Sequence, residues 1–139
     1  MKKTIISLMA CMALGASSAL AQDLNVNISD VHAGKGTLRV AVFNEEGYMS
    51  SVVTSALVEA RSKNAVVVFK NLKPGTYAVA VIQDEDNDGA LNKGMFGIPS
   101  EPFGFSNLTS MPMGTPSFED TCFELKEDTT VKIKMISFF

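Results

Sequence analysis

Residues 65–82, AVVVFKNLKPGTYAVAVI, decide the fold of this 139-residue chain. Two apolar runs, 65–69 and 77–82, flank a short polar segment, and both are rich in residue types that favour strands. Between the runs, Pro74 pre-sets φ for a tight turn and Gly75 is free to take a positive φ. Because both runs are apolar on each face, we predict two central strands of a sheet that pair as a hairpin.

Two further segments alternate between apolar and polar residues, with the period of a half-buried strand. They are 37–42, TLRVAV, and 130–135, TVKIKM, and each should cover a core on one face and meet water on the other. Weaker strand candidates are 24–29, 118–125 and 52–60, the last of which also fits a short helix. About seven short strands separated by turns predict an all-β sandwich.

The regular succession of predicted strands and short turns is interrupted between Asp84 and Ser117. A connection of this length is unusual inside a small domain. It is also too apolar for a solvated linker, since it contains Phe96, Ile98, Phe103, Phe105 and Met111. We therefore expect one long ordered loop that folds back over an end or an edge of the sandwich.

Four stretches in order carry a resemblance: 69–77 (FKNLKPGTY), 84–92 (DEDNDGALN), 97–107 (GIPSEPFGFSN) and 116–120 (PSFED). Together they resemble a family of exported bacterial proteins known only as domain of unknown function 2141. The first stretch also resembles the hairpin of transthyretin-like and carboxypeptidase-regulatory-like sandwiches.

The resemblance covers essentially the whole chain after residue 21. It implies an exported, antiparallel sandwich of immunoglobulin-like or transthyretin-like type, and it implies no established activity. The family usually has a histidine just before the first acid of the loop, where this chain has Gln83. That departure weakens the idea of a histidine-bearing metal centre.

The acidic loop after residue 83 matches the opening half of a calcium loop of the EF-hand type. Asp84, Asp86 and Asp88 stand at positions one, three and five, and Gly89 at position six permits the sharp turn. Asn92 at position nine also fits. We interpret Asp84, Asp86, Asp88 and Asn92 as candidate calcium ligands.

The match to a calcium loop fails at its end, because Met95 occupies position twelve, where a bidentate glutamate normally closes the shell. Glu101 or Glu119 is available as a distal ligand, and waters are a further way to complete a weak site. The competing interpretation is a plain acidic turn, since Asp-Asn-Asp-Gly is also a good turn sequence.

The Phe-rich loop offers an alternative function. Phe103 and Phe105, beside Pro99 and Pro102, are suited to line a groove for a small ligand or a peptide. The competing interpretation is that the rings cap the end of the core, because no convergent polar groups accompany them.

Enzyme signatures are absent from the sequence. His32 is the single histidine, it lies in a turn between predicted strands, and no nucleophile motif accompanies it. We therefore predict no enzymatic activity and an isolated surface histidine; a hydrolase would need a base built around His32. The terminal Phe138-Phe139 resembles the end signal of outer-membrane β-barrels, but the absence of Trp and the two-sided apolar strands count against a small barrel.

The N-terminus reads as a signal peptide, residues 1–21, with Lys2 and Lys3, an apolar run and the cleavage pattern Ala19-Leu20-Ala21. The apolar run is too short to span a membrane. Cleavage leaves one domain, 22–139, in which Cys122 is the only cysteine, so an intramolecular disulfide is impossible.

Removal of two lysines and no acid moves the net charge from −3 to −5, which argues against nucleic acid and anionic membranes as partners. We therefore expect a periplasmic or secreted, non-enzymatic binding or structural module without membrane insertion. Its partner, whether a protein, a glycan or a small ligand, is not specified by the sequence.

Overall fold

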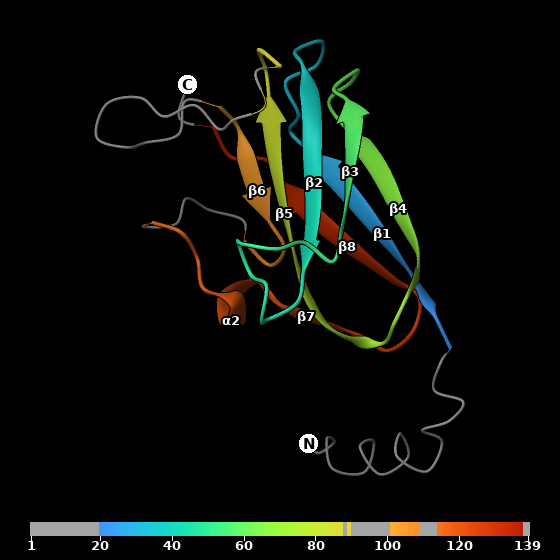
Figure 1. Ribbon diagram of the computed structural model, residues 1–139. Coiled ribbons are helices and arrows are strands. Elements are labelled where there is room, and N and C mark those ends of the chain that lie inside the picture. Colours follow the sequence, from blue (N-terminus) through green and yellow to red (C-terminus); the bar gives the residue numbers. More distant parts are fainter. Residues whose placement is uncertain (1–19, 88, 90–100, 109–113, 138–139) are drawn as a thin grey trace.

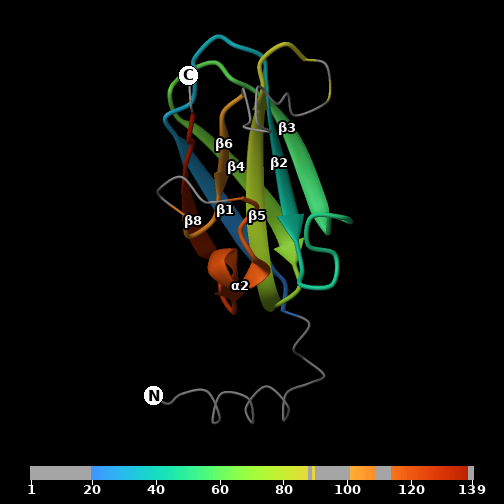
Figure 2. The ribbon, with the colours of Figure 1, turned by 90° about the vertical axis from the view of Figure 1, so that its left-hand side faces the viewer.

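The computed structural model describes residues 20–87, 89, 101–108 and 114–137, and its strands form two sheets packed face to face (Figures 1 and 2). One sheet has the order β4-β1-β8; the other has the order β3-β2-β5-β6, with β7 also paired to β5. The elements are β1 (Gln22–Ser29), β2 (Thr37–Phe43), β3 (Thr54–Glu59), β4 (Ala65–Leu72), β5 (Gly75–Asp84), β6 (Phe103–Phe105), α2 (Phe118–Thr121), β7 (Phe123–Leu125) and β8 (Thr129–Lys134). This architecture confirms the predicted all-β sandwich.

The core lies between the sheets and is built by alternating strand residues. The inward faces of β1, β2, β5 and β8 are buried, and they include Leu24, Val26, Ile28, Leu38, Val40, Val42, Tyr77, Val79, Val81, Val131 and Ile133. The polar residues between them, such as Arg39 and Lys132, are exposed. The alternation predicted for 37–42 and 130–135 is therefore confirmed.

The prediction of two central strands is right for β5 and wrong for β4. β5 lies between β2 and β6, whereas β4 is an edge strand of the smaller sheet. Val67 and Phe69 face the core, while Val66 and Val68 are 62% and 44% exposed. Three successive valines hide this alternation, because the same residue type occupies both faces.

The predicted hairpin is also wrong, although the turn is present. β4 pairs with β1, with Phe69 opposite Leu24, and β5 pairs with β2, with Val81 opposite Val40. The turn between Leu72 and Gly75 therefore carries the chain from one sheet to the other. Turn chemistry fixes a reversal of direction, but it does not decide whether the second strand pairs with the first or crosses to the facing sheet.

The two sides of the sandwich differ. On one side, Phe103 and Ile136 exchange backbone hydrogen bonds of 3.0 and 2.6 Å, which tie β6 to the segment after β8. On the other side, β3 and β4 are edges that pair with no further strand in the part of the chain that the structure describes. β1 and β8 pair in parallel, the one departure from an antiparallel arrangement among the described strands.

The two weakest strand candidates had different outcomes. Residues 54–59 form β3, so the helical alternative for 52–60 is wrong. The predicted strand 118–125 contains a helical turn, α2, before β7 begins. Ser117 caps this helix, because its side chain accepts a hydrogen bond of 3.1 Å from the Asp120 amide. Cys122 ends α2 and is half-buried.

Several predictions fall on residues that the structure does not describe. They include residues 1–19 of the expected signal peptide, most of the segment between residues 88 and 100, and the terminal Phe138-Phe139. Of the long loop, residues 101–108 are described, and they contain β6. No helix among the described residues is long and apolar enough to cross a membrane.

Candidate metal site

Asp84 ends β5 and is the first acid of the predicted calcium loop. Its side chain is fully buried, beside the start of β2, where Thr37 lies opposite it. Asp84 Oδ2 accepts hydrogen bonds from Arg39 Nε at 3.2 Å and from the Gly89 amide at 2.8 Å. A buried carboxylate requires such partners. They fix its orientation and hold Gly89 beside the end of β5.

Two further carboxylates meet Asp84 at this end of the sandwich. Glu101 is 4% exposed and comes from the segment that leads into β6, while Asp86 is exposed at the rim. One oxygen from each of the three carboxylates lies within 4.8 Å of the others. Oxygens that share one Ca²⁺ at its usual bond length lie within about 5 Å of one another, so the spacing fits that ion.

Of the predicted ligands, the structure therefore brings together Asp84 and Asp86. Asp88 and Asn92 lie outside the described residues. Glu101, one of the two distal acids considered for the incomplete shell, joins the cluster. Glu119 does not, because it lies in α2, at the opposite end of β5 from Asp84 (Figures 1 and 2).

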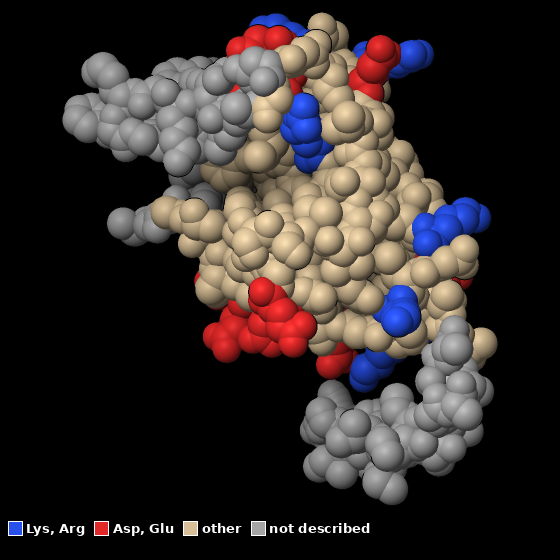
Figure 3. All heavy atoms as spheres, viewed as in Figure 1, with Lys and Arg blue, Asp and Glu red and all other residues tan. Residues whose placement is uncertain are grey.

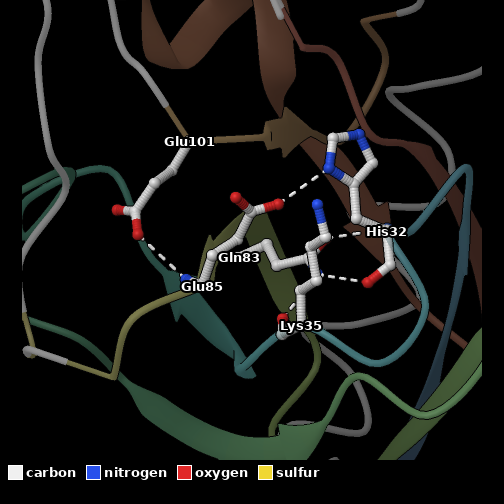
Figure 4. A network of polar contacts seen from close by, with 5 residues as sticks. All are labelled: His32, Lys35, Gln83, Glu85 and Glu101. Atoms are coloured by element: carbon white, nitrogen blue, oxygen red, sulfur yellow. Dashed lines mark hydrogen bonds and ion pairs between the residues drawn. The ribbon is translucent and has the colours of Figure 1, made fainter.

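Gln83 anchors the base of the loop (Figure 4). Its side chain is fully buried, Oε1 accepts the His32 amide at 3.0 Å, and Nε2 donates to the carbonyls of His32 and Lys35, both at 2.7 Å. The side-chain amide of Gln83 thus supplies the hydrogen bonds that a neighbouring strand would otherwise give to these backbone groups of the β1–β2 turn. Strand parity places Gln83 on the core face with Val81, and a glutamine at a core position signals such a role.

His32 is not the isolated surface histidine that the sequence suggested. Its Nδ1 lies 2.7 Å from Glu85 Oε2, and the two side chains are 34% and 25% exposed. The Glu85 amide in turn donates to Glu101 Oε2 at 2.9 Å. Figure 4 shows the resulting path from His32 through Glu85 to Glu101. Sequence reasoning missed this pair because the two residues are 53 positions apart.

Gly36 brings the β1–β2 turn into direct contact with the acidic loop. Its φ is +70°, and a Cβ at this position would stand 2.0 Å from the Asp84 carbonyl oxygen and 2.6 Å from Glu85 Cα. Only glycine permits this approach. The turn and the loop are therefore packed as one unit at this end of the sandwich.

The two phenylalanines of the alternative binding site are buried. Phe103 and Phe105 are 7% and 8% exposed, they form most of β6, and they belong to a second apolar cluster with Phe43 and Ala80. Their rings meet edge to face, with centroids 6.2 Å apart. The geometry supports the interpretation that they fill a core.

The comparisons place the chain in a family. The model of a family described as uncharacterized proteins conserved in bacteria (DUF2141) matches residues 26–134, which include every strand except the first residues of β1. No curated protein and no solved structure matches the chain. The match spans most of the sandwich and both described ends of the acidic loop, so this chain belongs to the DUF2141 family of bacterial proteins.

Proposed function

We propose that this chain is an exported, non-enzymatic binding or structural module whose acidic loop binds Ca²⁺. The observation that carries the metal site is the cluster of Asp84, Asp86 and Glu101, whose oxygens lie within 4.8 Å of one another. Carboxylate oxygens are the ligands that Ca²⁺ prefers. Export rests on the basic start, the apolar run and the cleavage pattern of residues 1–21.

The ion would act by linking two segments. Asp84 is the last residue of β5, Asp86 lies in the turn that follows it, and Glu101 belongs to the segment that enters β6. Three carboxylates this close repel one another, and a shared cation removes the repulsion. An ion that binds only the folded arrangement therefore stabilises it by mass action.

Burial gives the three ligands different roles. Asp84 and Glu101 are held by hydrogen bonds from Gly89 and Glu85, so their positions are set before an ion arrives. Asp86 is exposed and leaves the cluster open to solvent. Arg39 contributes one positive charge beside Asp84, which lowers the affinity relative to a site of carboxylates alone. We expect the affinity of extracellular calcium modules, about 10⁻⁴ to 10⁻³ M.

The alternative, a receptor for a small ligand or a peptide built on the Phe-rich loop, gains no support from Phe103 and Phe105, since both rings are buried. The partner of the module, a protein, a glycan or a small ligand, is therefore sought elsewhere on the surface.

The test compares Asp86→Asn and Glu101→Gln with Glu119→Gln. The first two remove a charge from the cluster but keep an oxygen at the same place, and the third removes an exposed charge from α2, outside the cluster. Melting temperatures of the mature protein are measured in EDTA and in 10 mM CaCl₂. We expect Ca²⁺ to raise the melting temperature of the wild type and of Glu119→Gln, and to have little effect on the other two.

The measurement in EDTA separates binding from simple destabilisation. The Ca²⁺ shift of each variant is measured from its own melting temperature in EDTA, so a change in stability without the ion does not enter the comparison. Equal Ca²⁺ shifts in all four proteins would contradict the proposed site, and so would the absence of any shift in the wild type.

A further inference from the structure

The open side of the sandwich carries an interaction surface that is separate from the acidic loop. β4 has eight residues and pairs with β1 along one edge only, in the described part of the chain. Its other edge therefore presents a row of backbone N–H and C=O groups toward solvent. Such an edge is a ready template for an added strand, and proteins usually block or use it.

The side chains along this edge are apolar and basic. Val66 and Val68 are 62% and 44% exposed on the outer face of β4. The segment 60–76, which contains β4 and both of its turns, has four basic residues and no acid in a chain whose overall charge is negative. The four are Arg61, Lys63, Lys70 and Lys73.

The basic residues are only partly neutralised. Arg61 pairs with Glu59 at 2.8 Å and Lys70 lies 3.8 Å from Asp23, whereas Lys63 and Lys73 are exposed and have no ion pair with any described residue. Figure 3 shows Lys and Arg side chains along the right-hand flank, where β3 and β4 lie, and acidic side chains gathered near α2. The segment 60–76 thus carries a net positive charge in a chain whose overall charge is negative.

A hollow of about 430 Å³ opens at the end of β4. It is lined by Asn44, after β2, by Val53, before β3, by Asn71, Leu72 and Lys73, at the end of β4, and by Gly75, Thr76 and Tyr77 of β5. Val53 is 40% exposed. Polar and apolar side chains line the hollow, and Leu72 and Lys73 place it at the end of β4.

We propose that β4 docks an extended segment of a partner protein in which apolar and acidic residues alternate. The segment adds a fourth strand to the β4-β1-β8 sheet. Its backbone pairs with the free edge, and its apolar side chains continue the inward row of Val67 and Phe69. Its acids then share the outer face with Lys70, between the turns that carry Lys63 and Lys73. The hollow beside Leu72 takes an apolar side chain at the end of the segment.

A second copy of this chain fits the same edge less well. Antiparallel pairing of two β4 strands brings together two segments that each carry four basic residues and no acid, and like charges across a strand pair are destabilising. The charge therefore selects an acidic partner. The surface is independent of Ca²⁺, since β4 belongs to the other sheet from β5, which ends at Asp84, and shares no residue with the Asp84 cluster.

The test uses fluorescently labelled synthetic peptides and the mature protein in EDTA. The first peptide has nine residues in which valine alternates with glutamate; the second replaces each glutamate by lysine; the third has the first composition in an order without alternation. We expect saturable binding of the first peptide by fluorescence anisotropy, and no saturable binding of the other two. Hydrogen exchange in the complex should slow in β4 and not in β8.

Two double variants provide the matched comparison. Lys63→Glu/Lys73→Glu reverses the two charges of the open side that have no ion pair with a described residue. It should lower the affinity for the first peptide roughly tenfold, because two attractive contacts become repulsive. Lys132→Glu/Lys35→Glu reverses two exposed lysines, of β8 and of the β1–β2 turn, and should leave the affinity within twofold. Addition of CaCl₂ should not change either result, so failure here and failure of the metal site are distinguishable.

Three outcomes would overturn the proposal: no binding of the alternating acidic peptide, equal binding of the acidic and basic peptides, or equal weakening by both double variants. A fourth outcome that would overturn the proposal is measured by light scattering. A dimer that Val66→Thr/Val68→Thr converts to a monomer would show that a second copy of the chain occupies the edge instead.

Discussion

Replacement of Gln83 by leucine tests whether one buried amide holds the β1–β2 turn against the acidic loop. Gln83 is fully buried, and its side chain makes three hydrogen bonds to the backbone of the turn, at 2.7, 2.7 and 3.0 Å. Leucine has a similar volume and no polar atom. Each lost bond costs about 1 kcal/mol, and more where water cannot reach the abandoned backbone group. We therefore expect a loss of about 3 kcal/mol, a large share of the stability of a small domain.

The assay is urea unfolding at 25 °C followed by far-ultraviolet circular dichroism. The chain contains one other glutamine, and Gln22→Leu is the matched control. Gln22 lies at the start of β1, and its one side-chain hydrogen bond, of 3.2 Å to the Leu20 carbonyl, is lost when residues 1–21 are removed. This variant should stay within about 0.5 kcal/mol of the wild type.

The result that would refute this reasoning is a Gln83→Leu variant that is as stable as Gln22→Leu. A loss of stability with an unchanged dependence on urea concentration would support it, because the native and unfolded states would then bury the same surface as before. A smaller loss, near 1 kcal/mol, would mean that water replaces the amide at the half-exposed His32 turn.

Two further predictions concern other contacts of the fold. Gly36→Ala should lower the free energy of unfolding by more than about 3 kcal/mol and abolish the Ca²⁺ shift in melting temperature, because its Cβ would collide with the Asp84 carbonyl. The control is Gly34→Ala, where φ is +82° and nothing lies within 4 Å of the added Cβ. It should lower the free energy of unfolding by about 1–2 kcal/mol and keep the Ca²⁺ shift. Burial, with a smaller contribution from Asp120, raises the pKa of Tyr48 above its ordinary value of 10.0. The folded state keeps this proton to higher pH than the unfolded state, so its stabilisation is complete below pH 10 and is lost as the pH rises through the folded-state pKa. Thermal unfolding between pH 9 and 11 should therefore show a steeper fall for the wild type than for Tyr48→Phe, and parallel profiles would contradict the assignment.

The sequence predicted the fold wherever a strand alternates cleanly. β2 and β8 were found because their apolar and polar residues differ in type. β4 was predicted to be a central strand and is an edge strand. Valines occupy both of its faces, so its sequence has no periodicity that distinguishes the two positions. The helix α2 was missed although Ser117, followed by Glu119 and Asp120, is a helix start. A four-residue helix leaves no periodic signal.

In the candidate site, too, the residues with a local sequence pattern were predicted and those that depend on long-range contacts were not. Asp84 and Asp86 were found from local spacing, since ligands that are two residues apart are visible in one loop. Glu101 was only one of two possible distal acids, because nothing in the sequence shows which one folds back to β5. The contacts of His32 and Gln83 depend on how the β1–β2 turn packs against the end of β5, and such long-range contacts leave no local pattern.

The central claim is tested most directly by calorimetric titration of Ca²⁺ into the chelator-stripped mature protein. We predict saturable binding of one ion per chain with a dissociation constant of about 10⁻⁴ to 10⁻³ M. At an ion concentration one hundred times the dissociation constant, this should stabilise the fold by about 2.7 kcal/mol. Heats no larger than those of dilution, together with an unchanged melting curve, would show that Asp84, Asp86 and Glu101 form a hydrogen-bonded cluster of carboxylates and not a metal site.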